Sequence, residues 1–166
     1  MKTTRILHSF GLLLAMLVSG SAWPTDLPKE GSYDIKTCFT RNSTYIEYSL
    51  TQFAYSYEEA GLVVSSPPGG LFDQEEVRCV GMTASMAGQR TGGAVCIGVA
   101  KDGDRRLTRF TYDTNGRVQR EAVSGTGKYD GLVLAGSTVQ NVGPAPDPKA
   151  ARAETCNRQT GSYKLR

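Results

Sequence analysis

Histidine is almost missing from this chain of 166 residues. The only one, His8, lies in an amino-terminal segment that we expect to be removed from the mature protein. Serine or cysteine triads with histidine, histidine zinc sites and a histidine general base all need an imidazole. The composition therefore excludes these mechanisms for the mature chain.

The amino-terminal segment has the features of a secretory signal peptide. Lys2 and Arg5 precede an apolar run over residues 6–18, and small residues follow at positions 19–22. The apolar run is shorter than a comfortable membrane-spanning helix. We expect residues 1–22 to be cleaved off, which predicts a periplasmic or secreted protein with no membrane anchor after cleavage.

Excess positive charge is also lacking. The whole chain has 19 Lys and Arg residues against 16 Asp and Glu. Two of the basic residues, Lys2 and Arg5, belong to the signal peptide, which leaves 17 against 16 and a net charge of +1. A nucleic-acid-binding domain normally has a clear basic excess. We therefore expect no nucleic-acid partner.

Metal-binding motifs are absent from the sequence. The four cysteines form no Cys-x-x-Cys pair, and the acidic turn at residues 102–104 lacks the further ligands of a calcium loop, so we expect no metal and no cofactor. An even number of cysteines in an exported chain predicts two disulfides. Of the three possible pairings we favour Cys79 with Cys96, which would join neighbouring strands, and Cys38 with Cys156, which would join the two ends of the domain.

Long amphipathic helices are missing too, and the chain alternates with the period of a β-strand. In residues 31–40, Tyr33, Ile35, Thr37 and Phe39 fall on one face. Further strands are expected at residues 43–50, 52–57, 62–65, 75–83, 93–100, 105–112, 117–123, 132–139 and 161–165, with a turn at 58–61 and a helical turn at 149–154. This spacing predicts an all-β domain over residues 31–166, after a leader at 23–30. We expect an antiparallel barrel of about eight strands, closed or nearly closed.

The stretch Ser124–Ser137 is rich in turn residues. Gly125 and Gly127 permit positive φ, and Asp130-Gly131 is a preferred two-residue turn pair. We expect this stretch to form a hairpin between two strands.

One strand face carries only small side chains. In residues 93–100 this face consists of Ala94, Cys96, Gly98 and Ala100. A face without bulk indicates that another group packs closely against it.

The turn residues of the second half resemble a known family. The Asp102–Asp104 turn, the Gly125–Gly131 run, Gly136 and the closing Gly161–Leu165 segment are similar to the allene oxide cyclase-like and dirigent-like proteins, which include exported bacterial members. These are calycin-type antiparallel β-barrels. The resemblance covers the chain from Cys96 onward and implies a barrel whose interior takes a hydrophobic or phenolic small molecule. Some members are isomerases, but no catalytic residue of the family aligns with a position in this chain.

Polar side chains within the strands are the candidate site residues. Glu47 shares a strand face with Tyr45, and Arg109 shares one with Leu107. On an inward face, a carboxylate or guanidinium would need a partner and would mark a ligand or proton-transfer site. The outward arrangement is the commoner one, since charged residues are rarely buried. We take Glu47 as the candidate catalytic residue, and Tyr45, Tyr48 and Arg109 as candidate ligand-binding residues.

Three functions are compatible with these observations. We favour an exported soluble β-barrel that binds a small apolar or amphipathic molecule without catalysis. One alternative is an isomerase or cyclase that uses a carboxylate such as Glu47. The other is a secreted inhibitor of a lytic enzyme or protease that presents a loop such as residues 65–71. The sequence leaves open whether a reaction occurs and which oligomeric state the protein adopts.

Overall fold

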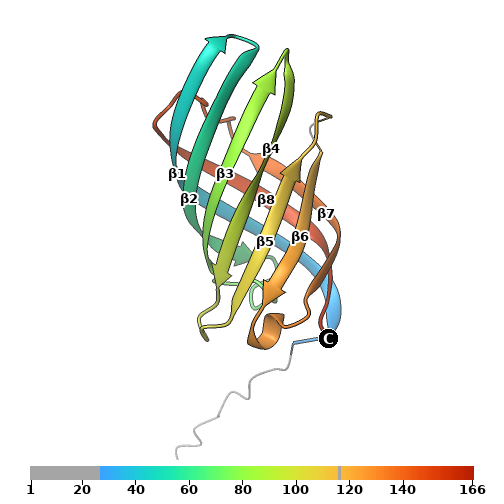
Figure 1. Cartoon of the computed structure of the whole chain (residues 1–166). Helices are drawn as coiled ribbons and strands as arrows, with labels where there is room; N and C mark the ends of the chain where they lie inside the picture. The colour runs from blue at the N-terminus through green and yellow to red at the C-terminus, as the bar shows by residue number, and fades with distance from the viewer. Residues whose placement is uncertain (1–26, 116) are drawn as a thin grey trace, which may run out of the picture.

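The barrel architecture is present in the computed structural model, which describes residues 27–115 and 117–166. The predicted signal peptide lies outside the described residues. Within the described part, one sheet of eight antiparallel strands curls into a nearly closed barrel (Figure 1). Its elements are β1 (Glu30–Ser49), β2 (Gln52–Ser65), β3 (Glu76–Met86), β4 (Gln89–Val99), β5 (Arg105–Tyr112), β6 (Val118–Gly125), the short 3-10 helix η1 (Gly127–Tyr129), β7 (Val133–Val142) and β8 (Arg152–Lys164). The predicted fold class is confirmed.

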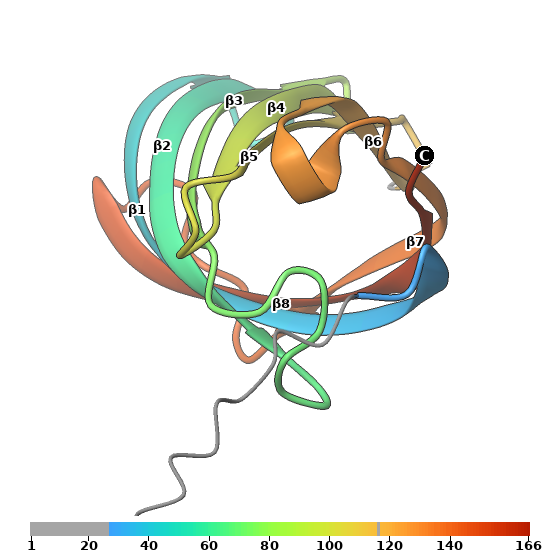
Figure 2. The same ribbon diagram turned by 90° about the horizontal axis from the view of Figure 1, so that it is seen from below.

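The strand order explains why the barrel is only nearly closed. The order β6-β5-β4-β3-β2-β1-β8-β7 places the longest strand, β1, between its sequence neighbour β2 and the last strand β8. β6 and β7 are the two edges of the sheet, and its curl brings them side by side (Figure 2). No hydrogen-bonded ladder joins these two strands in the part of the chain that is described.

Side chains of β1 alternate between the barrel interior and its exterior. Tyr33, Ile35, Thr37 and Phe39 are all buried, which confirms that they share one face. Tyr33, Ile35 and Phe39 belong to the hydrophobic core of the barrel. The interior is therefore built on the period-2 pattern of the first strand.

β1 and β2 are longer than predicted. The turn expected at residues 58–61 is wrong, because Glu58 and Glu59 lie within β2 and pair with Asn42 and Arg41 of β1. The two strands run without interruption to a tip at residues 50–51, and this hairpin projects beyond the body of the barrel (Figure 1).

The stretch Ser124–Ser137 does not form the predicted hairpin. The chain reverses there, but β6 and β7 are not paired, and η1 buries the ring of Tyr129 at one end of the barrel (Figure 2). The Tyr129 hydroxyl donates a hydrogen bond to the Leu71 carbonyl at 3.0 Å. Burial of this large aromatic ring, rather than a two-residue turn, sets the path of the chain.

Aromatic rings seal this end of the barrel, which we call the floor. Phe72, in the loop between β2 and β3, has no exposed surface. Its ring stacks on Tyr129 with centroids 6.1 Å apart and meets Tyr33 edge-on at 5.3 Å. The floor therefore depends on residues from three separate segments of the chain.

The connection between β7 and β8 is a turn rather than the helical turn predicted at residues 149–154. The Asp147 carboxylate accepts a hydrogen bond from the Lys149 backbone N–H at 2.9 Å, and β8 begins at Arg152. Asp side chains commonly stabilise turns in this way, and the prolines on either side of Asp147 disfavour a helix.

Two disulfides join directly opposed residues of neighbouring strands. Cys79–Cys96 links β3 to β4, and Cys38–Cys156 links β1 to β8. These are the pairs favoured from the sequence. The first bridge is buried inside the barrel, whereas Cys38 lies on the outward face of β1.

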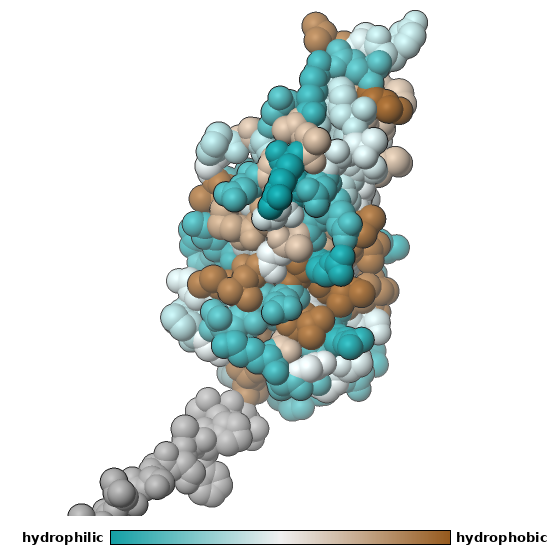
Figure 3. Space-filling view, turned by 90° about the vertical axis from the view of Figure 1, so that its left-hand side faces the viewer, coloured by the Kyte–Doolittle hydropathy of each residue, from teal (hydrophilic) through white to brown (hydrophobic). Residues whose placement is uncertain are grey.

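Exposed hydrophobic side chains are found on the outer surface. On β3 and β4, Val80 is 65% exposed and Met82 58%, and Ile97 and Val95 are about half exposed. Figure 3 shows hydrophobic side chains interspersed with polar ones on one side of the barrel. No helix in the described residues is both long and apolar enough to cross a membrane. Apolar side chains are thus found on the outer surface as well as in the interior, and some interior positions hold polar side chains instead.

The bridge between β1 and β8 offers a test of how much a disulfide stabilises the sheet. We expect the double variant C38A/C156A to lower the free energy of unfolding by about 5 kcal/mol, because the bridge closes a loop of more than 100 residues. Urea denaturation of the oxidised protein measures the change. The matched control is T40A/E154A, an opposed pair on the same strands without a bridge, for which we expect a change within about 0.5 kcal/mol. Equal effects of the two double variants would contradict the expectation.

Candidate functional site

The barrel interior contains two chambers that share part of their walls. The inner chamber has a volume of about 50 Å³ and lies between the disulfide Cys79–Cys96 and the side chains of Phe110 and Arg120. The outer chamber, of about 550 Å³, lies toward the rim and is bordered on one side by residues 144–148. Residues common to both walls are Glu59, Tyr112, Val118, Val139 and Asn157. The two spaces therefore adjoin each other along the barrel axis.

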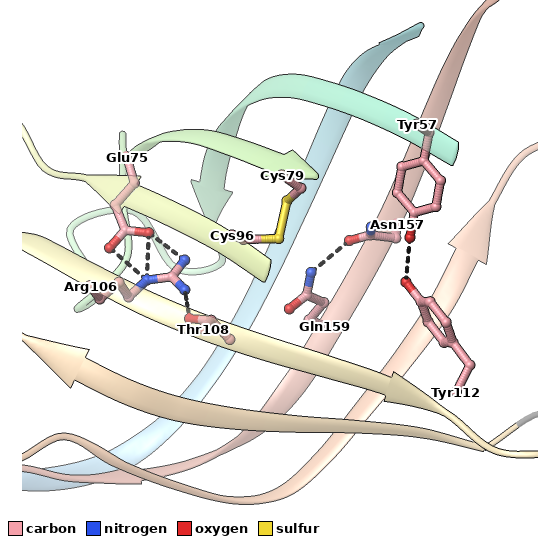
Figure 4. Close-up of a disulfide and its surroundings, with 9 residues drawn as sticks. All are labelled: Tyr57, Glu75, Cys79, Cys96, Arg106, Thr108, Tyr112, Asn157 and Gln159. Atoms are coloured by element: carbon pink, nitrogen blue, oxygen red, sulfur yellow. Dashed lines mark hydrogen bonds and ion pairs between the residues drawn. A yellow bond between two sulfur atoms is a disulfide. The ribbon is translucent and has the colours of Figure 1, made fainter. Parts of the chain in front are cut away.

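A buried ion pair lies beside the inner chamber (Figure 4). Arg106 Nε donates to both oxygens of Glu75, at 3.0 and 2.9 Å, and Arg106 Nη2 donates to Oε2 at 2.6 Å. Arg106 Nη1 donates to Thr108 Oγ1 at 2.6 Å. Both charged side chains are almost fully buried. Multiple hydrogen bonds of this kind are needed to offset the loss of hydration of two buried charges.

The small face of β4 makes room for this pair. A Cβ atom at Gly98 would lie 2.9 Å from Glu75 Oε2 and 3.1 Å from Arg106 Nε. The prediction that another group packs closely against this small face is therefore confirmed at Gly98, where the group is the ion pair.

A second buried arginine, Arg120, has unsatisfied nitrogens. It projects from β6 into the inner chamber and is 7% exposed, and neither Nε nor Nη1 has a hydrogen-bond partner among the described residues. Its guanidinium carbon lies 5.0 Å from the centroid of the Tyr33 ring and 5.1 Å from that of Phe72. Burial, assisted by the nearby charge of Arg106, lowers the pKa of Arg120 to about 10, and Tyr33 and Glu75 oppose this effect only in part. The guanidinium is thus charged at neutral pH but poorly compensated.

A third arginine and a carboxyl group lie closer to the rim. Arg41 on β1 is 6% exposed, lines the outer chamber, and has no partner for Nε and Nη2 in the described part of the chain. It is opposite Glu59 of β2 in the strand register. Burial raises the pKa of Glu59, and the charge of Arg41 opposes this effect only in part. Glu59 is therefore an interior carboxyl group that takes up a proton more readily than an exposed one.

Two tyrosines of the outer chamber wall meet inside the barrel (Figure 4). The hydroxyls of Tyr57 and Tyr112 are 3.2 Å apart, and burial raises the pKa of both. Gly81, opposite Tyr57 in the ladder, is needed for this arrangement, because a Cβ there would lie 2.4 Å from the Tyr57 ring. Nearby, the Gln159 amide donates to Asn157 Oδ1 at 2.9 Å.

The four site residues predicted from the sequence lie outside both chambers. Tyr48 is 89% exposed, and Arg109 pairs with Glu121 on the outer surface. Tyr45 and Glu47 lie on the projecting β1–β2 hairpin, beyond the chamber walls. There Tyr45 stacks on a neighbouring ring and Glu47 forms an ion pair with a lysine of the β7–β8 connection. This ion pair lowers the pKa of Glu47.

The interior polar residues that sequence reasoning missed do follow a readable pattern. Arg41 continues the buried face of β1, and Arg120 shares one face of β6 with Val118 and Ala122. A charged residue at an apolar position of a strand is the signal that could have identified them. Glu75 has the same signal, because in the strand predicted at residues 75–83 it shares a face with Val77 and Cys79; in the structure it lies just before β3 and is buried on that face.

The fold and interior define an antiparallel β-barrel with polar groups around internal chambers. Comparison with known proteins finds no matching family model, no similar curated protein and no similar solved structure. The resemblance to allene oxide cyclase-like and dirigent-like barrels stays a prediction. Within residues 27–115 and 117–166, no cluster of three or more histidine, cysteine, aspartate or glutamate side chains could hold a metal ion.

The buried ion pair predicts a large cost when one partner is neutralised. We expect Glu75→Gln to lower the free energy of unfolding by about 3–5 kcal/mol, because Arg106 would remain buried without its counter-charge. Chemical denaturation at pH 7 measures this. The control is Glu58→Gln, which breaks the exposed ion pair with Arg78 and should cost less than about 1 kcal/mol. A cost for E75Q as small as that of E58Q would contradict the interpretation.

The raised pKa of Glu59 predicts a pH-dependent difference in stability. A carboxyl group whose folded pKa exceeds its unfolded value binds more protons in the folded state, so the stability it contributes is present at low pH and is lost as pH rises through the folded pKa. Compared with Glu59→Gln, the wild type should lose free energy of unfolding as pH rises from below the ordinary value of 4.5. Denaturation of both proteins between pH 3 and 8 measures the difference. A constant difference over this range, or one of opposite sign, would show that the environment of Glu59 is not as described.

Proposed function

We propose that this protein binds a small amphipathic molecule inside its barrel and does not transform it. The observation that carries the proposal is the outer chamber of about 550 Å³. It shares wall residues with the inner chamber, which is lined in part by buried polar groups. Ligand sites in proteins are commonly concave spaces of roughly 300–1,000 Å³ with a few convergent polar groups. A barrel that only had to support itself would fill this space with aliphatic side chains.

The chamber walls favour an amphipathic ligand over a purely apolar one. Tyr55, Tyr57 and Tyr112 provide aromatic surface in the outer chamber, while Arg41 and Glu59 provide charge. An entirely apolar molecule would leave the charged groups without water and without partners, which is costly. A ligand with an apolar body and a polar group satisfies both kinds of wall.

The proposed location is the periplasm or the exterior of the cell. Two disulfides support this location, because such bonds form and persist in oxidising compartments. The signal peptide expected at residues 1–22 is the second reason. Both arguments concern where the protein is stable rather than what it binds.

An isomerase or cyclase is the second candidate function, and Glu59 is the observation that favours it. This carboxyl group lines both chambers, and its raised pKa would suit proton transfer. Glu47, the candidate from the sequence, lies outside the chambers. A catalytic role would therefore fall to Glu59, with Tyr57 and Tyr112 beside it.

Filling the outer chamber tests the proposed function. The neutral fluorescent dye Nile red should bind the wild-type protein saturably, and Val139→Trp should weaken binding at least about ten-fold, because Val139 lines both chambers. Fluorescence titration measures the affinity, and near-UV circular dichroism checks that the variant is folded.

The matched control for this experiment is Val133→Trp. Val133 belongs to the same strand, β7, but is 55% exposed, so the same substitution there should leave dye binding unchanged. Saturable binding that is equally strong in both variants would place the dye on the outer surface and refute the proposal. Absence of saturable binding to the wild type would refute it as well.

A further inference from the structure

The inner chamber contains a positive charge that the described residues do not neutralise. Of the two arginines on its wall, Arg106 has its hydrogen bonds satisfied by Glu75 and Thr108. Arg120 is more than nine-tenths buried, and its Nε and Nη1 have no partner in the part of the chain that the structure describes. A buried charge left in this condition is costly to the folded protein.

The two interior carboxyl groups form no hydrogen bond with Arg120 in the described part of the chain. The charge of Glu75 attracts Arg120, but both of its oxygens are hydrogen-bonded to Arg106. Glu59 lies opposite Arg41 in the ladder, and no hydrogen bond or ion pair joins it to Arg120 among the described residues. What surrounds the Arg120 guanidinium instead is aromatic, with Tyr33, Phe72 and Phe110 at 5.0–5.9 Å. Ring faces attract a cation but accept no strong hydrogen bond from the free N–H groups.

The sizes of the chambers indicate what could approach Arg120. About 50 Å³ accommodates a group of only a few heavy atoms, since one water occupies roughly 30 Å³ in the liquid. The outer chamber, about eleven times larger, adjoins it through shared wall residues such as Val139 and Asn157. A molecule with a compact head group and a larger body therefore fits the two spaces together.

We propose that the inner chamber binds the carboxylate of an amphipathic organic acid, with Arg120 as its charged partner and the outer chamber holding the body of the acid. This inference rests on the proposed function and narrows the ligand class. A carboxylate is small enough for the inner chamber, and its two oxygens accept hydrogen bonds from guanidinium N–H groups. It also neutralises the charge of the Arg120 guanidinium, whose Nε and Nη1 have no partner among the described residues.

Paired ligands that differ only in charge test the inference. cis-Parinaric acid, a fluorescent fatty acid, should bind at least about ten-fold more tightly than its uncharged methyl ester, because a charged hydrogen bond contributes at least that factor. In Arg120→Met, the acid should bind no more tightly than the ester. Arg109→Met removes an arginine from the outer surface and should keep the full difference between acid and ester.

Thermal unfolding of the ligand-free protein separates a binding role of Arg120 from a structural one. Arg120→Met replaces an uncompensated buried charge with an unbranched apolar side chain, so we expect its Tm to rise above that of the wild type. Higher stability together with lost acid selectivity is the expected result. A fall in Tm would show that Arg120 is structurally satisfied and would overturn the inference.

The remaining outcomes distinguish the inference from the proposed function. Equal binding of acid and ester to the wild type overturns the carboxylate assignment but leaves binding in the barrel intact. Loss of acid selectivity in Arg41→Met, with selectivity kept in Arg120→Met, moves the head group to the outer chamber and overturns the role of Arg120. A stabilising effect of sodium chloride that requires Arg120, with acid and ester bound equally, shows that a small inorganic anion alone occupies the inner chamber. Failure of both parinaric ligands and of Nile red to bind refutes the proposed function itself.

Discussion

The ion pair between Glu75 and Arg106 is the interaction on which the interior depends. Glu75 comes from the end of the β2–β3 loop and Arg106 from β5, so their three hydrogen bonds fix the floor loop to the barrel wall. Phe72, three residues before Glu75, is thereby held among the aromatic rings of the floor. Because this pair uses both oxygens of the fully buried Glu75 carboxylate, Nε and Nη1 of Arg120 have no hydrogen-bond partner among the described residues.

The fold was largely predictable because its governing signals are local. Alternation of Tyr33, Ile35, Thr37 and Phe39 follows from the strand period. The pair Cys79–Cys96 joins strands that follow each other in the sequence, whereas Cys38–Cys156 joins the first and last strands. The errors concern positions where tertiary contacts override local preference. Residues 58–61 have turn-like composition but are held in β2 by the ladder with β1, and the glycine-rich stretch at 124–137 is shaped by burial of Tyr129.

The site was much less predictable than the fold. Glu47, Tyr45, Tyr48 and Arg109 satisfy the rule that polar groups in strands are worth attention, but that rule does not say which end of a strand lies inside the barrel. Tyr45 and Glu47 have the inward parity of β1 and lie past the rim. Arg41, four residues earlier than Tyr45 on the same face, is inside. Strand length and barrel stagger decide this difference, and both arise from pairings between distant segments.

The boundary between β6 and β7, which we call the seam, has no backbone ladder in the described part of the chain and is therefore the weakest part of the barrel wall. Both disulfides staple strands that already share a ladder, so neither crosses this seam. Widening the barrel there breaks no backbone ladder, whereas widening it between any other neighbouring strands does. Arg120 and Val139 lie on the two strands that flank the seam. Transient widening of the wall would therefore admit solvent first to the Arg120 guanidinium, whose Nε and Nη1 have no partner within residues 27–115 and 117–166.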